Sequence, residues 1–327
     1  ELSGNHNNNL EQAYKLIEAA SWAGVDAIKI QTFTADSITM NIKNNNFKIL
    51  DKESLWKNQY LYNLYKKAST PYEWHEKIFK KAKSYNLICF SSPFDESAVD
   101  FLYDLKAPAF KIASFENNHI PLIKKVISTN KPTILSTGLI NLKELNQVVK
   151  MFPKMDNLAL LKCTSTYPAS PKNINLKTII DMKKKYNCEV GLSDHTIGTG
   201  VALASIAYGA TIIEKHLTLN RKDKAVDSAF SLEPKEFKVL KDQSIDVWES
   251  LGKIKYGPTN LEKKSLKYRR SIFISKNVKK NEEANSSNLR VIRPATGMDP
   301  KYYFKILGKK FSKNLAKGTP LKKIHLK

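Results

Sequence analysis

The sequence predicts an α/β fold whose centre is a parallel β-sheet covered on both faces by helices. Short apolar runs alternate with longer segments of helical periodicity along most of the chain. Near-continuous apolar strands are typical of parallel sheets, because crossover helices bury both faces of each strand. The strands are expected at 26–30, 87–91, 109–113, 132–136, 157–163, 188–193 and 211–215.

Amphipathic segments separate most of these runs, and each is expected to form a helix that connects two parallel strands with right-handed topology. They lie at 10–23, 73–85, 96–105, 119–129, 141–152, 173–186 and 198–208. The N-terminal residues ELSGNH have the composition of the other strand ends, so we interpret Glu1–Ser3 as the end of one more strand. Eight parallel strands with helices between them predict a TIM (β/α)8 barrel.

A change of composition predicts a second, smaller domain. Residues 1–251 are expected to form the barrel, since about 250 residues is the usual size of that fold. Segment 252–268 is polar, contains a Gly-Pro break and is interpreted as a linker. Residues 269–327 contain short strands and turns, and a unit this small has a marginal core. We therefore expect it to pack on the barrel or on a second subunit.

The charge of the chain is strongly positive, but its make-up argues against nucleic-acid binding. The formal net charge is +23, and only five of the 54 basic residues are arginine: Arg221, Arg269, Arg270, Arg290 and Arg293. Surfaces that read bases or clamp phosphates favour arginine, so a solvated lysine surface is preferred. No run of 18 apolar residues predicts a membrane span. Three cysteines without CxxC spacing indicate reduced thiols in a cytoplasmic protein.

Two histidines at strand ends are the clearest candidates for chemistry. His195 follows the strand in GLSDHT, and His216 ends the strand in TIIEKH. Adjacent parallel strands end at the same edge of a sheet, so the two imidazoles are expected to converge on a metal ion. Asp194, Glu214 and Asp227 lie nearby in sequence as oxygen ligands or supporting partners. The alternative is that the histidines are separate polar caps of two loops.

Lysines and serines at the other strand ends predict an anion site. Lys29 and Lys111 lie within apolar runs, where a lysine is costly unless it is paired. Several serines follow the same strands, and charge-assisted hydrogen bonds to oxyanions are strong. The pattern therefore favours a small phosphorylated, carboxylated substrate. A solvated lysine on an edge strand is the alternative for either position alone.

A series of motifs resembles the sialic acid synthases along the whole chain. These motifs include ELSGNH, DAIKIQT, CFSSPFD, FKIASFE, LSTG, VGLSDHT, IIEKH, VDSAFSL and VIRPATG. TPYEWH and LKCTSTYP are most similar to the pseudaminic acid branch of the family, whereas the N-acetylneuraminate branch has an asparagine where this chain has Ser165. The C-terminal residues resemble an antifreeze-like (SAF) domain.

The resemblance implies condensation of phosphoenolpyruvate and water with 2,4-diacetamido-2,4,6-trideoxy-L-altrose, giving pseudaminic acid and phosphate. It implies a divalent cation, Mn²⁺ or Mg²⁺, on His195 and His216, with Glu1 as a general base or an electrostatic stabiliser. It also implies a domain-swapped homodimer in which Arg293 reaches the partner's site. Phosphoenolpyruvate would be bound by Lys29, Ser92, Lys111, Ser114, Ser136, Ser165 and Ser193. The sugar would be bound by Gln31, Glu116, Tyr167, Asp227 and Arg293.

Two alternatives remain open at this point. Within the enzyme class, the chain is an N-acetylneuraminate or legionaminate synthase, which a panel of acceptor sugars would distinguish. In a different class, the basic charge and the antifreeze-like domain suggest a non-catalytic carbohydrate-binding protein. That alternative does not explain two histidines and two lysines at strand ends.

Overall fold

The computed structural model describes residues 1–327, which form two compact units, Glu1–Gly252 and Lys253–Lys327. The first unit contains a seven-stranded sheet whose strands follow the chain order β1 to β7. Every neighbouring pair is parallel, as the apolar runs predict. The strands are β1 (Ala27–Thr32), β2 (Ile88–Pro93), β3 (Phe110–Ile112), β4 (Thr133–Ser136), β5 (Leu158–Cys163), β6 (Glu189–Ser193) and β7 (Ile212–Glu214).

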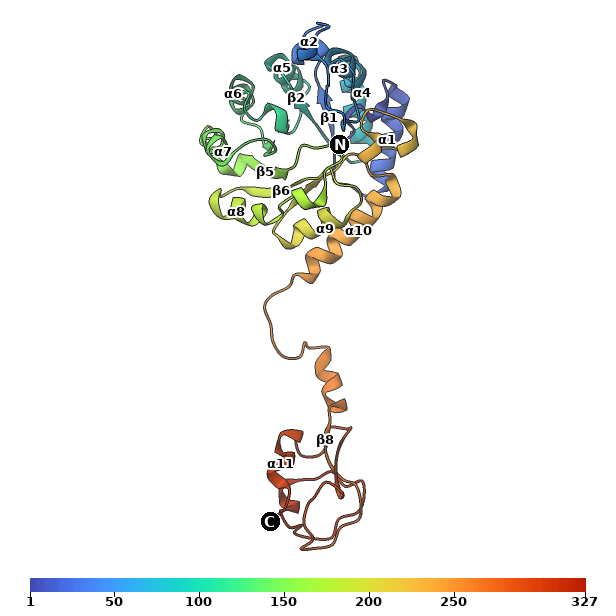
Figure 1. Cartoon of the computed structure of the whole chain (residues 1–327), viewed down its shortest axis with the longest axis vertical. Helices are drawn as coiled ribbons and strands as arrows, with labels where there is room; N and C mark the ends of the chain where they lie inside the picture. Colours follow the sequence, from blue (N-terminus) through green and yellow to red (C-terminus); the bar gives the residue numbers. More distant parts are fainter. The chain divides into compact units, whose positions relative to one another are not determined.

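Helices surround this sheet in the end-on view of Figure 1. All seven predicted helices are present, although α8 begins four residues later than expected. The preceding Asn175 has a left-handed backbone, with φ of 54°, which a continuing helix does not allow. The helices that follow strands or precede β1 are α1 (Leu10–Trp22), α4 (Tyr72–Ser84), α5 (Glu96–Asp104), α6 (Ile120–Ser128), α7 (Leu142–Val149), α8 (Lys177–Lys185) and α9 (Gly200–Ala207).

Three helices of the first unit were not predicted. The long connection between β1 and α4 contains α2 (Ala35–Ile38) and α3 (Leu61–Ala68), and α10 (Pro234–Ser250) follows the last strand. Only Leu240 of α10 is buried, and a helix that buries so little does not need the apolar periodicity by which the other helices were predicted. Pro234 at its first position and the reciprocal side-chain caps of Glu233 and Glu236 are the local signals that define its start.

The prediction of a strand at Glu1–Ser3 is wrong in its detail, because only two of these residues pair with the sheet. The N–H of Leu2 donates to the carbonyl of Lys29 in β1 at 2.9 Å. The carbonyl of Glu1 accepts from the N–H of Leu217, just after β7, at 2.8 Å. Ser3 then enters a 3₁₀-helix with φ of 48°. Backbone hydrogen bonds thus connect the first and last strands, and the unit is TIM-barrel-like with seven assigned strands rather than eight.

The apolar core lies between the strands and the helices around them. Leu16 and Ile17 of α1 and Ile78 of α4 are fully buried against β1 and β2. A second, larger cluster joins β3 to β6 with α5 to α8. Burying a Leu or Ile side chain contributes about 1.5–3 kcal/mol. The helices are therefore fixed on the sheet, and the strand ends are held in position for polar groups.

The second unit has its own sheet and core. Strands β8 (Ser271–Ile274) and β9 (Leu289–Ile292) pair antiparallel, and α11 (Tyr303–Ile306) follows them. Its core includes Ile272, Phe311 and Leu321, each fully buried. Within the predicted linker 252–268, residues Glu262–Tyr268 form a 3₁₀-helix, and Lys267 accepts a backbone hydrogen bond from Ala295. None of the helices in either unit has the length and hydropathy needed to cross a membrane.

Candidate active site

Three pairs of side chains connect the ends of β6 and β7. Ser193 donates to Glu214 at 3.0 Å. One residue further, Lys215 pairs with Asp194 at 2.8 Å and donates to the carbonyl of Thr196. At the next position the rings of His195 and His216 lie 5.4 Å apart between centroids. Successive strand residues point to opposite faces, so the first and third pairs share a face that the second pair does not.

Asp194 is therefore not placed to bind a metal ion with the histidines. Its side chain and that of Lys215 are almost completely buried, and the two form an ion pair with each other. Burial lowers the pKa of Lys215, and the attraction of Asp194 opposes that shift. The expectation that Asp194 supplies an oxygen ligand is wrong, because sequence proximity does not say which face a strand residue takes.

The histidine pair converges as predicted, and each ring has a distinct hydrogen-bonding state. Nδ1 of His195 lies 3.0 Å from the carbonyl of Thr164, which can only accept, so Nδ1 carries a proton and Nε2 is the nitrogen that faces a possible ligand. Burial lowers the pKa of His195, but the contact with Cys163 outweighs it and raises that pKa. Nδ1 of His216 lies 3.6 Å from Asp227 and has no hydrogen-bond partner. Burial and the neighbouring His195 hold the pKa of His216 well below its usual value, so its ring is neutral.

Two lysines and two glutamates form a buried ionic cluster beside the histidines. Lys29 pairs with Glu1 and lies 3.9 Å from Glu214. Lys111 lies 3.2 Å from the other carboxylate oxygen of Glu214. Burial lowers the pKa of Lys29 to about 8, while Glu214 opposes this change. Burial alone would raise the pKa of Glu214, but the two lysines outweigh it and lower that pKa.

The predicted serines lie at the ends of β2 to β6 and in the turns that follow them. Ser92 accepts from Lys29 at 3.3 Å, and Ser114 accepts from the backbone N–H of Gly138 at 3.1 Å. A Cβ at Gly138 would lie 2.7 Å from the Ser114 hydroxyl and would also clash with Ser165, so only glycine fits between them. The hydroxyl of Ser136 is buried without a partner. Such a hydroxyl is available to a ligand.

Of the two acidic residues predicted to contact the sugar, Asp227 is buried and Glu116 is half-buried. Burial raises the pKa of Glu116 to about 7, and one of its carboxylate oxygens has no partner. Asp227 accepts from the hydroxyl of Ser3, and its backbone N–H donates to Asn5. Burial raises the pKa of Asp227, and the hydrogen bond from Ser3 opposes this. Gln31 is half-buried in β1, with its backbone paired in register with Ser92.

Aromatic rings line the histidine side of the cluster. Tyr167 packs at a tilt of 51° against His195, with 4.5 Å between ring centroids, and the centroid of Phe230 lies 5.0 Å from that of His216. The ring of Trp56 lies 5.7 Å from that of Tyr167. The sequence motifs identified Tyr167 but not Trp56, because Trp56 lies in the long β1–α4 connection, where no periodic pattern gives a side chain its direction.

Cys163, expected to be a core thiol, also contacts this group. Its sulfur lies 3.8 Å from Nδ1 of His195 and 3.7 Å from the Ser165 hydroxyl. Burial would raise the pKa of Cys163, but the interaction with His195 outweighs it and lowers the pKa to about 7. Its position as the last residue of β5, beside the motif that contains Ser165, is the signal that places it here.

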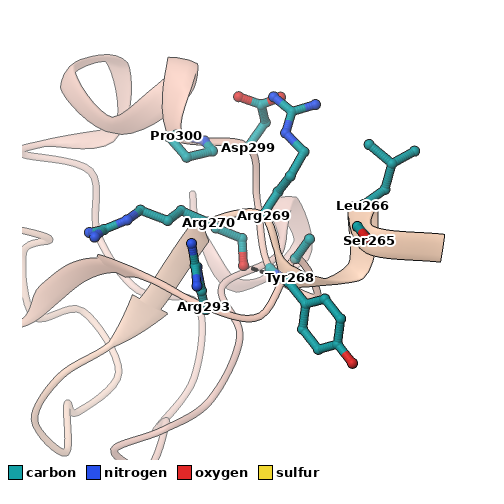
Figure 2. A pocket seen from close by; sticks show the side chains of 11 residues that line it. Ser265, Leu266, Tyr268, Arg269, Arg270, Arg293, Asp299 and Pro300 are labelled. Carbon is teal, nitrogen blue, oxygen red and sulfur yellow. Dashed lines mark hydrogen bonds between the residues drawn. The ribbon is translucent and has the colours of Figure 1, made fainter. Parts of the chain in front are cut away.

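Arg293 belongs to the second unit. It lines an open cleft together with Arg269 and Arg270, shown in Figure 2. Ser271 at the base of this cleft donates to the carbonyl of Pro294 and accepts from the N–H of Gly297, which fixes the loop that carries Arg293. Three of the five arginines of the chain thus gather in one cleft. Of these three arginines, only Arg293 was predicted from the sequence to bind the substrate.

The strand-end cluster combines three kinds of chemistry in one place. Buried lysines and free hydroxyls suit a phosphate and a carboxylate. Two convergent imidazoles suit a divalent cation. No group of three or more His, Cys, Asp or Glu side chains is arranged to hold a metal ion by itself. A cation here would therefore take its remaining ligands from water or substrate. Carboxylates beside these groups suit proton transfer.

Comparisons with known proteins identify the family of this chain. The NeuB family model matches residues 16–256, and the SAF domain model matches residues 269–327. The chain belongs to the NeuB family. The predicted fold class, the resemblance to the sialic acid synthases and the assignment to a family of enzymes are thereby confirmed.

Individual relatives are similar along nearly the whole chain. The pseudaminic acid synthase of Campylobacter jejuni serotype O:2 is 44% identical, covering 98% of this chain and 94% of its own. That of Helicobacter pylori is 39% identical, covering 98% and 95%. The N,N'-diacetyllegionaminic acid synthase of the same Campylobacter strain is 36% identical, covering 96% and 95%. The solved N-acetylneuraminic acid synthetase of Leptospira borgpetersenii has a TM-score of 0.71 at 29% identity, covering 80% and 87%.

Proposed function

We propose that this chain is a pseudaminic acid synthase. It joins phosphoenolpyruvate, water and 2,4-diacetamido-2,4,6-trideoxy-L-altrose into pseudaminic acid and releases phosphate. The observation that carries the proposal is the buried cluster in which Lys29 and Lys111 lie beside the pair His195 and His216. Identities of 44% and 39% to pseudaminic acid synthases, against 36% to a legionaminic acid synthase, support the choice of sugar.

Phosphoenolpyruvate binds through its phosphate and carboxylate to the lysines and hydroxyls. Lys29 and Lys111 are buried, so their attraction to an anion is weakly screened. Within the chain their charges are balanced by Glu214 and Glu1. The free hydroxyl of Ser136 and the hydroxyls of Ser92, Ser114, Ser165 and Ser193 provide the remaining donors.

A divalent cation, Mn²⁺ or Mg²⁺, fits the histidine pair. His195 presents Nε2 because its Nδ1 faces the Thr164 carbonyl, and His216 is neutral, which is the state that binds metals. Asp227 supports His216 from 3.6 Å. When bound there, the cation supplies Lewis-acid polarisation of the acceptor aldehyde. A chelator should abolish phosphate release, and Mn²⁺ should raise the thermal midpoint of the apoprotein but not that of His216→Ala.

The remaining chemistry falls to residues of the chain. The enol carbon of phosphoenolpyruvate forms a bond to the aldehyde carbon of the sugar. The aldehyde C=O bond opens to an alkoxide, which takes up a proton, and an oxocarbenium-like centre is left. Water adds to this centre and loses one proton. The hydroxyl that remains loses the second proton as the C–O bond to phosphate breaks, which gives the ketone and phosphate. Glu1 is the base that takes the proton from water, and its carboxylate is held by the Ser3 N–H at 2.7 Å and by Lys29.

The acceptor sugar binds on the aromatic side of the cluster. Glu116, Asp227 and Gln31 provide polar contacts to its hydroxyl and acetamido groups. Tyr167 and Phe230 cover its apolar parts, the C6 methyl group and the acetyl methyls. Aromatic faces next to polar anchors are typical of sites for partly apolar ligands.

Arg293 completes the site from the partner chain of a domain-swapped homodimer. Its cleft holds three exposed arginines, and Arg221 is the one arginine of the chain in an ion pair. Residues 253–261 form no helix or strand, and their nine residues span about 15–18 Å as a random coil. Ile254 and Tyr256 in this stretch are each 95% exposed, as expected for side chains that become covered on dimerisation.

A cytoplasmic location is part of the proposal. Cys89, Cys163 and Cys188 are all free, and Cys163 lies within the candidate active site. Unpaired cysteines are typical of proteins in a reducing compartment.

The test of the proposed function is phosphate release by purified protein with phosphoenolpyruvate, Mn²⁺ and a panel of acceptor sugars. The 6-deoxy altrose acceptor should give the highest kcat/KM. Faster turnover of N-acetylmannosamine, or of the legionaminic acid precursor, would replace the pseudaminic acid assignment by the corresponding one. No turnover with any sugar would support the binding-protein alternative.

A further inference from the structure

The connection between β1 and α4 forms a hairpin-like loop over residues 48–60. Lys48 and Tyr60 form an antiparallel bridge, and Ile49 exchanges two backbone hydrogen bonds with the opposite side, at 2.9 and 2.8 Å. Leu50 and Leu55 in this loop are 59% and 44% exposed. The loop is therefore not built around an apolar core of its own.

Trp56 is the residue by which this loop contacts the candidate active site. Its indole N–H donates to the carbonyl of Val226 at 3.0 Å. Val226 immediately precedes Asp227, whose carboxylate faces His216. The indole ring packs at a tilt against Tyr167, with 5.7 Å between centroids and an interplanar angle of 54°. Tyr167 in turn contacts His195 at a similar tilt.

Both contacts of Trp56 end at a candidate metal ligand. One runs through the Tyr167 ring to His195, and the other through the Val226 backbone to Asp227 and His216. Trp56 lies outside the four apolar clusters that form the cores of the two units. It is half-buried, so part of its ring remains accessible beside Tyr167. A tryptophan that served only to anchor the fold would be expected in one of those clusters instead.

We propose that Trp56 is a specificity-determining residue for the acceptor sugar. The loop 48–60 presents its indole ring as the outer aromatic wall of the sugar subsite, beside Tyr167, where it covers a methyl group of a 6-deoxy amino sugar. The hydrogen bond to Val226 is a second contact of the same ring, next to Asp227, and the proposed role belongs to the ring. This inference rests on the proposed function and adds a residue to its sugar subsite.

Two substitutions separate the wall from the hydrogen bond. Trp56→Phe keeps an aromatic ring but loses the indole donor, and Trp56→Ala loses both. We expect Trp56→Ala to raise KM for the 6-deoxy acceptor about 10-fold or more, the usual discrimination that one methyl-sized contact gives. KM for phosphoenolpyruvate should change less than about twofold, because the lysines that bind it contact neither Trp56 nor Tyr167. Trp56→Phe should stay within about threefold of the wild type for both substrates.

A second readout tests selectivity itself. The ratio of kcat/KM for the 6-deoxy acceptor to that for its 6-hydroxy counterpart should fall about 10-fold in Trp56→Ala and stay nearly constant in Trp56→Phe. An unchanged ratio in Trp56→Ala overturns the proposal. An equal rise in KM for the acceptor sugar and for phosphoenolpyruvate does so as well. Trp22→Ala is the matched control, since Trp22 is 56% exposed at the end of α1 and should leave every parameter unchanged.

Thermal unfolding and the wild-type acceptor panel keep the outcomes distinct. If Trp56→Ala does not fold, Trp56→Leu, which keeps apolar bulk but lacks a ring face, takes its place with the same expectations. If the wild type releases no phosphate with the 6-deoxy altrose but uses another sugar, the proposed function is wrong. The role of Trp56 is then decided by the same ratio for that sugar and its analogue with one methyl or hydroxyl group changed.

Discussion

The two units of this chain hold positive charge in opposite ways. At the strand ends of the first unit, Lys29 and Lys111 are 5% and 2% exposed and are balanced by carboxylates. In the second unit, the cleft of Figure 2 gathers Arg269, Arg270 and Arg293, all exposed. A buried lysine must be paired within its own fold, because an isolated buried charge is too costly. An exposed arginine carries no such requirement and is free to take its partner from elsewhere.

The difference shows that the first unit contains the partners of its buried charges, whereas the second unit does not. The strand-end cluster has its cations, carboxylates and histidines already in contact, so it is preorganised by the barrel. In the arginine cleft, Arg270 donates to the carbonyl of Val291. No ion pair neutralises Arg269, Arg270 or Arg293, so their charges are open to a ligand or another chain.

The largest effect should follow from removing a histidine of the preorganised cluster. His216→Ala should lower kcat by about a thousandfold or more, because the residue is proposed to hold the cation that polarises the aldehyde. Phosphate release with Mn²⁺ measures this. His119→Ala, on the loop before α6, is the control and should retain full activity. Activity of His216→Ala near that of the wild type would contradict the metal-site proposal.

The exposed cleft gives the next prediction, a complementation test. Arg293→Ala and His216→Ala chains should each be inactive, and mixing them under subunit exchange should restore activity. Random pairing leaves half of the dimers mixed, each with one intact site of two, so about a quarter of wild-type activity is expected. Proven exchange without recovery would contradict the action of Arg293 on the partner's site.

Lys111→Met should affect both binding and stability. KM for phosphoenolpyruvate should rise far more than KM for the sugar.

The substitution also leaves Glu214 buried beside Lys29 with one partner fewer, which costs about 3–5 kcal/mol in the free energy of unfolding. Adding Glu214→Gln should recover much of that loss. Urea denaturation measures it, and Lys125→Met, which breaks an exposed ion pair with Asp100, should cost less than about 1 kcal/mol.

The smallest effect is the pH dependence of stability caused by Glu116. Its pKa is about 7 in the folded chain and 4.5 in the unfolded chain, so the folded state binds more protons between these values. Stability should therefore fall as pH rises from 4.5 to 7, by about 3 kcal/mol at most. Glu116→Gln should remove this slope in urea denaturation across that range. A slope that is unchanged in the variant would mean that Glu116 ionises freely when folded.

Much of the fold was predictable because it depends on local patterns. Seven apolar runs became the seven strands, and the alternating amphipathic segments became their helices. The side-chain caps Asn9, Asp95 and Asn141 mark three helix starts that are visible in the sequence itself. The eighth strand was wrong because pairing depends on backbone conformation. Leu2 already has helical angles, with φ of −84° and ψ of −36°, and Ser3 has φ of 48°.

The sequence by itself determined which residues lie at the strand ends, since strand periodicity and parallel topology bring those ends to one edge. It therefore placed His195, His216, Lys29 and Lys111 together. Only the tertiary structure decided which of their neighbours face the same side. The side chain of Asp194 pairs with Lys215 and not with the histidines. The ring of Trp56 contacts Tyr167 from a loop more than a hundred residues earlier in the chain. The physical reason is that strand geometry sets the direction of successive side chains, whereas the conformation of a long loop depends on its tertiary contacts.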